Sequence, residues 1–270
     1  MQLFTSDLDR TLIFSKNTIQ VAVDNCLCIE QLEEREISYI NATIEQLLRQ
    51  IHEKLHFVPV TTRSLAQYER ITLFQQAIVP EVAIVANGGI ILRNGQVDTV
   101  WQQHIENQRS LLPLSLLQIR DKFSKQLTAN FILRHHIIDE LFYCYIVDPQ
   151  MVDLNQIHDF NKALQQYGWH CSLQGRKLYI LPMFLSKGAA VQYIKSLRHY
   201  DWHFAAGDSL MDMSMLQLAN DYFVPLHGEL KKYAEQLNIA IVQKSGADFA
   251  EYFLEQILIS ITEKGSFNVT

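Results

Sequence analysis

Residues 2–12 read Gln-Leu-Phe-Thr-Ser-Asp-Leu-Asp-Arg-Thr-Leu, and the interpretation of the whole chain starts from this stretch. Residues Gln2 to Ser6 predict a short β-strand that ends directly before Asp7. Asp7 and Asp9 are two residues apart at the strand end, so their carboxylates point the same way and reach one site. One could be a nucleophile and the other a proton donor if a cation keeps the nucleophile ionised. An acidic turn would explain the same two residues taken alone.

Strand and helix patterns alternate in the first and last thirds of the chain. Further strands are predicted over 26–31, 36–40, 57–60, 82–85, 203–206, 222–225 and 239–242. Apolar side chains at helical spacing predict helices over about 40–55, from Ser186 onward, through Met215 and over 248–262. This alternation favours an α/β fold with a parallel sheet.

The middle of the chain has a different rhythm, in which one helix is followed by two strands, twice over. The predicted elements are a helix over 109–125, strands over 130–135 and 141–147, a helix over 153–167, and strands over 169–173 and 177–181. We therefore expect a small antiparallel sheet backed by helices, inserted into the alternating domain. The expected domains are a core of 1–88 with 184–270 and an inserted α+β domain of 89–183.

The composition excludes several classes of protein. The chain has 270 residues, a formal net charge of −6, and 48% hydrophobic against 19% charged residues, which is unlike a disordered or collagen-like chain. A mildly acidic balance disfavours nucleic acid as the main partner, because a phosphate backbone requires a basic surface. No stretch reads as a signal peptide, and no apolar run approaches the roughly 18–20 residues of a membrane span. With only four cysteines, the expectation is a soluble cytoplasmic protein without a membrane partner.

A second acidic motif follows the predicted strand over 202–206. It reads Gly-Asp-Ser-Leu-Met-Asp over 207–212 and places Asp208 at the turn. Asp212, four residues later, lies on the same side of the first helical turn. Carboxylates at a strand end suit Mg²⁺, which binds through carboxylates, substrate phosphate and water. An ordinary helix N-cap would explain Asp208 equally well.

Two further polar residues lie at expected element ends. Thr61 ends the strand over 57–60, where a hydroxyl and nearby backbone N–H groups can hold a phosphate oxygen, although it could simply cap a helix. Lys187 opens a helix, where a cation opposes the helix dipole and requires a nearby anion, although a solvated lysine would need none. Parallel sheets gather their sites at the carboxyl ends of strands. Together the four signals therefore supply a nucleophile, an acid, a metal site and phosphate-binding groups, which is the set that phosphoryl transfer needs.

These four motifs, in this order, resemble those of the haloacid dehalogenase-type (HAD) phosphatases. The chain is similar to the branch that carries a large α/β cap between the second and third motifs. That branch includes Cof-type sugar phosphatases and the sucrose- and mannosylglycerate-phosphate phosphatases. The Asp-Leu-Asp-Arg-Thr-Leu opening is also similar to HAD-type proteins of tellurite-resistance-associated gene clusters. The resemblance covers essentially the whole chain and implies a Rossmann-like core with a parallel sheet, plus an inserted α+β cap.

The resemblance implies specific roles for the first residues of the set. Asp7 corresponds to the nucleophile, and Asp9 to the general acid and base, which also lends its backbone carbonyl to the metal. Such an Asp9 needs a raised pKa, which the charge of a bound phosphate could supply. Thr61 and Lys187 correspond to the groups that orient the phosphoryl group, and Thr62, beside Thr61, is a further phosphate-binding candidate.

The resemblance also implies a magnesium site and a cap hinge. The implied Mg²⁺ ligands are Asp7, Asp9, Asp208 and Asp212, with Asp212 acting directly or through water. Asn87 and Gly88 match the step that leads into the cap and lines the site. Three residues depart from the family pattern: Arg10 and Thr62 replace glycines, and Met211 replaces an asparagine. A guanidinium at Arg10 could contact the substrate or only cover the edge of the site.

The implied activity is a Mg²⁺-dependent phosphatase that hydrolyses a small phosphorylated metabolite, such as a sugar phosphate, through an aspartyl-phosphate. The alternatives are a phosphomutase or phosphotransferase with the same motifs, and a non-catalytic protein that binds a phosphorylated metabolite. The cap should select the substrate, because it covers the leaving group. Its candidates are Arg134, His135, His136, Arg176, Lys177 and Tyr179. The residues expected to contact the substrate are Arg176 of the cap together with Arg10, Asn87 and Gly88. The sequence does not predict the substrate itself or the oligomeric state.

Overall fold

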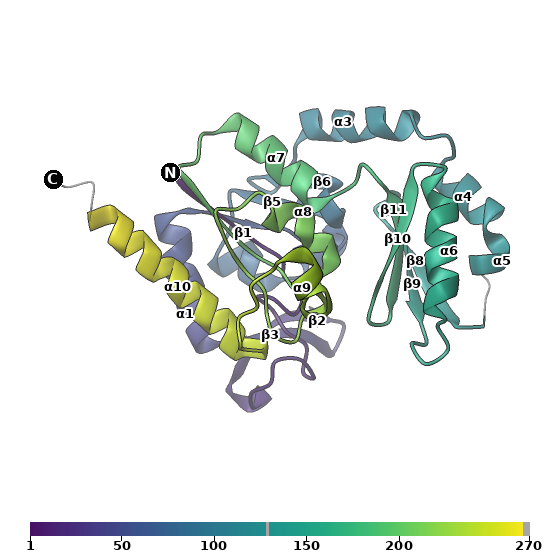
Figure 1. Cartoon of the computed structure of the whole chain (residues 1–270). Coiled ribbons are helices and arrows are strands. Elements are labelled where there is room, and N and C mark those ends of the chain that lie inside the picture. Colours follow the sequence, from purple (N-terminus) through teal and green to yellow (C-terminus); the bar gives the residue numbers. More distant parts are fainter. Residues whose placement is uncertain (128–129, 267–270) are drawn as a thin grey trace.

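The computed structural model describes residues 1–127 and 130–266, which form two sheets with helices packed on them (Figure 1). The larger sheet has four parallel strands in the order β13-β12-β1-β4. Their bounds are β1 Gln2–Ser6, β4 His56–Pro59, β12 Trp202–Ala206 and β13 Asp221–Phe223. A parallel bridge between Val60 and Ile84 joins β5, Val82–Val85, to β4. The α/β prediction with a parallel sheet is therefore confirmed.

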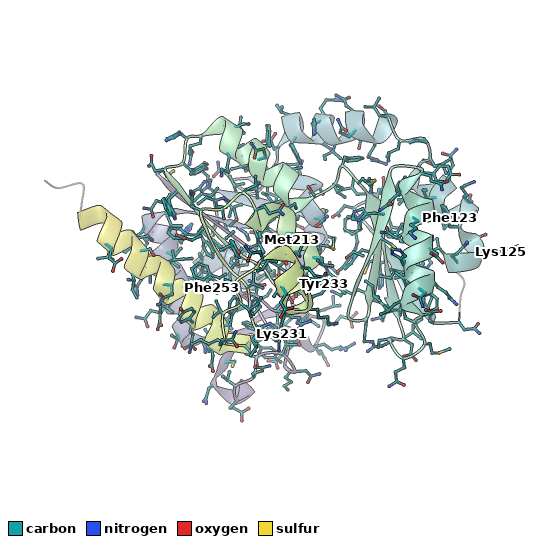
Figure 2. All side chains as sticks on the ribbon, viewed as in Figure 1. Phe123, Lys125, Met213, Lys231, Tyr233 and Phe253 are labelled. Atoms are coloured by element: carbon teal, nitrogen blue, oxygen red, sulfur yellow. The ribbon has the colours of Figure 1, made fainter. Side chains whose placement is uncertain are left out.

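Helices cover both faces of this sheet, so its strands are apolar on both sides. On one face, α1 (Ala42–Lys54) and α10 (Gly246–Ser266) pack against alternate strand residues such as Phe4. Phe253 of α10 lies close to Phe4, with ring centroids 5.9 Å apart (Figure 2). The other face packs against α7 (Lys187–Leu197) and α8 (Met213–Leu216).

Short elements surround the ends of β1, β4, β5 and β12. A hairpin of β2 (Cys26–Leu32) and β3 (Arg35–Asn41) follows the first motif, and α2 (Leu65–Glu69) and a π-helical turn (Leu73–Ala77) follow β4. The remaining short elements are 3-10 turns at Val23–Asn25, Ala86–Gly88, Leu210–Asp212 and Glu229–Tyr233, and α9 at Ala234–Leu237. These connections supply most of the polar side chains described below.

The second sheet comes from the middle of the chain and is antiparallel throughout, in the order β10-β11-β9-β8. Its strands are β8 Ile132–Ile138, β9 Phe142–Val147, β10 Trp169–Gln174 and β11 Lys177–Pro182. The helices on its outer face are α4 Leu116–Lys122, α5 Ser124–Leu127 and α6 Leu154–Gln165. Its other face is turned toward the larger sheet (Figure 1), where Tyr179 and Leu181 join the core beside α7.

Two predicted elements are wrong. The helix over 109–125 is interrupted: α3 spans Thr99–Ser110, and α4 begins only after Ser115. Pro113 explains the break, because it lacks an N–H group and disfavours helical backbone in the residue before it. Ser115 then caps α4 by accepting a hydrogen bond from the backbone N–H of Gln118. The strand over 239–242 is reduced to a single bridge between Pro225 and Val242.

One hairpin was not predicted at all. The strands β6 (Ile90–Arg93) and β7 (Gln96–Val97) extend the larger sheet beyond β5 in antiparallel pairing. Their turn is Asn94-Gly95, with φ angles of 49° and 76°. An Asn-Gly pair between apolar runs is a strong hairpin signal, so the sequence did contain the information. No helix in the described part of the chain is long and apolar enough to cross a membrane.

Candidate active site

The ends of three parallel strands bring the motifs together. Asp7 follows β1, Thr61 follows β4, and Asp208 follows β12 after Gly207. The three strands are neighbours and run parallel, so their carboxyl ends lie at one edge of the sheet. Lys187, at the start of α7, reaches the same point.

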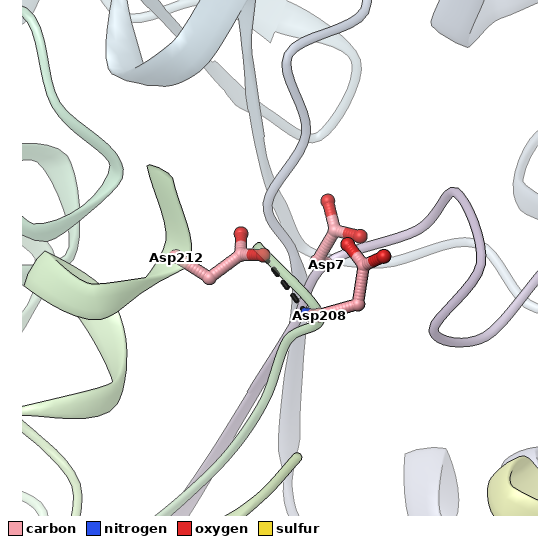
Figure 3. A group of neighbouring side chains, drawn as sticks. All are labelled: Asp7, Asp208 and Asp212. Atoms are coloured by element: carbon pink, nitrogen blue, oxygen red, sulfur yellow. Dashed lines mark hydrogen bonds between the residues drawn. The ribbon is translucent and has the colours of Figure 1, made fainter. Parts of the chain in front are cut away.

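Three buried carboxylates gather there. Asp7, Asp208 and Asp212 each offer one carboxylate oxygen, and these oxygens lie within 4.8 Å of one another (Figure 3). All three side chains are 10% exposed or less. Oxygen ligands from carboxylates are those that Mg²⁺ prefers. Three of the four predicted metal ligands are therefore close enough to share one cation through their side chains.

The Lys187 ammonium group lies between two of these carboxylates. Its Nζ donates to Asp7 Oδ1 at 2.5 Å and to Asp212 Oδ1 at 2.6 Å. Burial acts to lower the pKa of Lys187, but Asp212 and Asp7 outweigh it and raise that pKa above its ordinary value. Lys187 is therefore a permanent cation inside the site.

Asp212 organises the loop that carries Asp208. Its Oδ2 accepts hydrogen bonds from the backbone N–H groups of Asp208 at 3.0 Å and Ser209 at 2.9 Å, and from the Ser209 hydroxyl at 2.8 Å. A side chain on Gly207 would not fit, because its Cβ would lie 2.5 Å from the Asp212 Cβ. With both oxygens occupied, Asp212 suits a supporting role more than that of a principal ligand.

The acidic cluster carries more negative charge than Lys187 balances. Burial, together with Asp212, raises the pKa of Asp7 to about 7, despite the opposing effect of Lys187. Burial, then Asp7 and Asp212, raise the pKa of Asp208 well above its ordinary value. A divalent cation would remove this repulsion, because it favours the ionised form of every carboxylate around it. The residues present therefore fit Mg²⁺.

Asp9 has different surroundings, although it is only two residues from Asp7. Both of its carboxylate oxygens accept hydrogen bonds from Arg63, one from Nε and one from Nη2, each at 2.8 Å. Burial acts to raise the pKa of Asp9, but Arg63 outweighs it and lowers that pKa below its ordinary value. The raised pKa that a general acid at this position needs must therefore come from a bound phosphate acting against Arg63, a partner that the sequence did not reveal. The side chain of Asp9 also lies outside the three-carboxylate cluster, so only its backbone carbonyl remains as its predicted metal ligand.

The two threonines of the second motif are placed differently. Thr61 is fully buried, and its Oγ1 accepts a hydrogen bond from the backbone N–H of Arg63 at 3.1 Å. Thr62 lines the cleft in front of the acidic cluster, as does Tyr179 of β11. Thr62 is therefore the threonine that a substrate would meet first.

Arg10 lies at the rim of the cleft. Its φ of 68° is in the left-handed region, which explains why a glycine is usual at this position in the family. Its Nη2 donates to the carbonyl of His227 at 2.7 Å, and its Nε lies 3.6 Å from Asp208 Oδ2. Its side chain lines the cleft while fastened to the neighbouring loop, so it can both cover the edge and face a substrate.

Asn87 and Gly88 do not line the cleft. Asn87 donates from Nδ2 to the carbonyl of Leu185 at 3.1 Å. A Cβ on Gly88 would lie 2.3 Å from the carbonyl oxygen of Ser186. These two residues therefore hold the segment before β6 against the segment before α7, and neither lines the cleft.

The cleft itself has a volume of about 230 Å³ and is bordered by polar residues of both sheets. Of the candidates on the second sheet, Arg176, Lys177 and Tyr179 line it, whereas Arg134, His135 and His136 do not. Four further lining residues were not among the candidates from the sequence: Gln174, Gly175, Ser209 and Glu229. Gln174 directly precedes Gly175, and this glycine indicates the turn between the two strands that border the cleft. No feature of the sequence indicates that Glu229 lines the cleft.

Comparisons with known proteins bear on the family and the fold of this chain. The family model described as sucrose-6F-phosphate phosphohydrolase matches residues 1–238. A sucrose-phosphatase from Synechocystis sp. PCC6803, solved with sucrose and phosphate, is 17% identical with a TM-score of 0.64, over 95% of this chain and 96% of that one. A trehalose-6-phosphate phosphatase related protein is 14% identical with a TM-score of 0.56, over 98% and 100%.

A HAD-superfamily phosphatase from Bacteroides thetaiotaomicron is 13% identical with a TM-score of 0.55, over 97% and 96% of the two chains. At these identities the solved structures show the fold alone. No curated protein matches the sequence. The family match covers most of the chain, and it agrees with the HAD resemblance of the four motifs. The chain belongs to the sucrose-6F-phosphate phosphohydrolase family of the HAD superfamily, and it is a phosphoric monoester hydrolase.

Proposed function

We propose that this protein is a Mg²⁺-dependent phosphatase for a small sugar phosphate and that it works through an aspartyl-phosphate on Asp7. The observation that carries the proposal is the cluster of Asp7, Asp208 and Asp212 around Lys187, at the edge of the parallel sheet where β1, β4 and β12 end. Bound Mg²⁺, held by Asp7, Asp208 and the Asp9 carbonyl with support from Asp212, would neutralise phosphate charge.

In the first step, a carboxylate oxygen of Asp7 attacks phosphorus, and the bond from phosphorus to the sugar oxygen breaks. Lys187, which touches Asp7, stabilises the negative charge on the transferring group. Asp9, which Arg63 keeps ionised in the free protein, takes up a proton when the negatively charged phosphate binds and gives that proton to the departing sugar oxygen. In the second step, Asp9 takes a proton from water as that water attacks phosphorus. The bond to Asp7 then breaks, and inorganic phosphate and free Asp7 remain.

We further propose that residues 89–183 act as the substrate-specificity cap and that 1–88 with 184–270 form the catalytic core. Within the proposed cap, β6 and β7 continue the core sheet, so the antiparallel sheet supplies the surface over the cleft. Arg176 and Lys177 lie at the β10–β11 turn that borders the cleft. The lining contains Gln174 and Tyr179 but no aliphatic side chain, which suits a hydroxylated leaving group.

The test is phosphate release from a panel of sugar phosphates, phosphoglycerates and nucleotides, with Mg²⁺ and with chelator, for the wild type and Asp7→Asn. We expect Mg²⁺-dependent release that Asp7→Asn reduces by more than about 10³-fold, because a nucleophile cannot be replaced by its neighbours. Trapping of ³²P-labelled Asp7 after a brief reaction would identify the intermediate.

The same panel separates the alternatives. A phosphomutase or phosphotransferase would give an isomerised or transferred phosphate in place of inorganic phosphate. A binding protein would be stabilised by a compound that it does not convert. Full activity of Asp7→Asn would contradict the assignment of the nucleophile.

A further inference from the structure

We infer that Glu30, on the hairpin that follows the first motif, is a positioning residue that acts through Arg63 to set the orientation of the Asp9 carboxylate. This inference rests on the proposed function, because Asp9 is the proton donor only in that mechanism. Glu30 lies 33 residues from Arg63 in the sequence, and the fold brings the two side chains into hydrogen-bond contact.

Arg63 connects the two carboxylates. Its Nε and Nη2 donate to Asp9, its Nη1 donates to Glu30 Oε2 at 2.6 Å, and its Nη2 also donates to Ser38 Oγ at 3.0 Å. A guanidinium group has its N–H donors in one rigid plane. Because the group is rigid, the hydrogen bond from Nη1 to Glu30 also fixes the direction of the two hydrogen bonds that Arg63 donates to Asp9.

Glu30 is itself held on every side. Its side chain has no exposed surface. Its Oε2 also accepts from the Ser38 hydroxyl at 2.7 Å, and its Oε1 accepts from Arg70 Nη2 at 3.0 Å. The exposed side chain of Asp9, at 42%, is the one end of this network that opens to the cleft. The network thus runs from a fixed buried anchor to a group that faces the substrate.

The backbone of the hairpin is adapted to this role. The pairing of β2 with β3 changes register on both sides of Glu30, between Cys28 and Glu30 and between Glu30 and Gln31. Glu30 also forms a bridge with Ile71, which follows α2. Such irregularities redirect a side chain that regular pairing would leave elsewhere. Here the irregularity accompanies a carboxylate directed at the arginine of the second motif.

A buried carboxylate with two arginines could instead serve stability alone. A positioning role and a purely stabilising role predict different effects on the rate when the leaving group of the substrate is changed. A phenolate leaves without a proton, whereas a sugar alkoxide needs the proton from Asp9. The test therefore compares kcat/KM for p-nitrophenyl phosphate with kcat/KM for the sugar phosphate that the wild type hydrolyses fastest. This parameter covers the steps up to departure of the alcohol, so the later hydrolysis of the intermediate does not mask the effect.

For Glu30→Gln we expect kcat/KM to fall about 30–100-fold with the sugar phosphate and less than about threefold with p-nitrophenyl phosphate. Ser38→Ala, which removes one hydroxyl from the network, should show the same preference at about threefold. The matched control is Glu36→Gln on β3, whose carboxylate accepts only the Tyr39 hydroxyl among the described hydrogen bonds and does not border the cleft. It should change neither rate.

Equal losses with both substrates in Glu30→Gln and Ser38→Ala, or no loss in either variant, would overturn the inference. A wild type inactive on both substrates would instead contradict the proposed function. A crystal structure of Glu30→Gln decides the positioning independently of activity. We expect Asp9 to have lost at least one of its two hydrogen bonds to Arg63, and retention of both would refute the role of Glu30.

Discussion

Lys187 Nζ lies 2.6 Å from Oδ1 of Asp212, with both side chains 1% exposed or less. Two charges this deeply buried stabilise each other only while both are present, because each alone would lack compensation for its lost hydration. The same ammonium group also contacts Asp7. Stability and catalysis therefore depend on one lysine.

Lys187→Met should destabilise the protein by about 3–5 kcal/mol at neutral pH, because it leaves two buried carboxylates without their cation. Urea unfolding followed by circular dichroism measures this loss. Lys54→Met, at the exposed end of α1, is the matched control and should cost less than about 1 kcal/mol. A similar loss in both variants would argue against the central position of Lys187.

Mg²⁺ should stabilise the folded protein. A ligand at about 100 times its dissociation constant contributes about 2.7 kcal/mol, so thermal melts of chelator-treated protein should shift upward when Mg²⁺ is added. Asp208→Asn should abolish most of this shift, because it removes a carboxylate of the cluster. Asp153→Asn, at the N-cap of α6 and away from the cluster, should keep the shift. An undiminished shift in Asp208→Asn would place the metal elsewhere.

The cations at the β10–β11 turn should determine affinity more than chemistry. Lys177→Met and Arg176→Met are each expected to raise KM for the preferred sugar phosphate about tenfold and to change kcat about twofold or less, because in the proposed function these two residues would contact the leaving group and not the transferring phosphate. Arg134 lies on the same antiparallel sheet but does not border the cleft, so Arg134→Met should leave KM and kcat unchanged. Steady-state kinetics of the three variants decides between a binding and a solvent-facing role for the turn.

Acid should destabilise the protein partly through His203 on β12. Burial lowers its pKa to about 4 from 6.5, and its ring is hydrogen-bonded to Thr5 Oγ1 at 2.8 Å and to the Leu218 carbonyl at 3.0 Å. The unfolded chain therefore binds the proton first as pH falls below 6.5, and stability is lost progressively down to about pH 4.

Between pH 7 and 4.5 this one histidine should account for about 2 kcal/mol of lost stability. His203→Gln should lower stability at pH 7 but flatten the pH dependence by that amount, as measured by urea unfolding at several pH values. The exposed His199 offers the control, since His199→Gln should leave the slope unchanged. An identical slope in wild type and His203→Gln would exclude His203 as the titrating group.

The parts of the fold that sequence reasoning predicted share a physical cause. Strands such as Val82–Val85 are buried on both faces, so they read as apolar runs that end abruptly at polar motifs. The carboxyl-end rule then places Asp7 and Asp208 together without further information. The elements that were predicted wrongly depend on local backbone chemistry. Pro113 interrupts a helix although the helical spacing of apolar residues continues past it. Asn94-Gly95 forms the turn of a hairpin whose strands are too short to show the alternation of apolar and polar residues.

The site was predictable to the extent that strand ends determine it. Arg63 and Glu30 escaped notice because their partnership spans 33 residues of sequence and depends on an irregular hairpin. Arg176, Lys177 and Tyr179 could be named but not separated from Arg134, His135 and His136, because strand alternation alone does not say which face meets the cleft. Thr62 borders the cleft together with Tyr179, which lies on the other sheet and so could not be linked to it from the sequence.

Gly88, just before β6, and Ser186, just before α7, lie so close that a Cβ on Gly88 would be 2.3 Å from the Ser186 carbonyl oxygen. Asn87 and Leu185 are hydrogen-bonded beside them. Nearly a hundred residues, among them the β6–β7 hairpin and the whole antiparallel sheet, therefore start and end at one place. A segment whose two ends lie together can differ in length or sequence without moving the carboxylates at the strand ends. Under the proposed function, the substrate preference of the cap can therefore change while the hydrolytic centre stays the same.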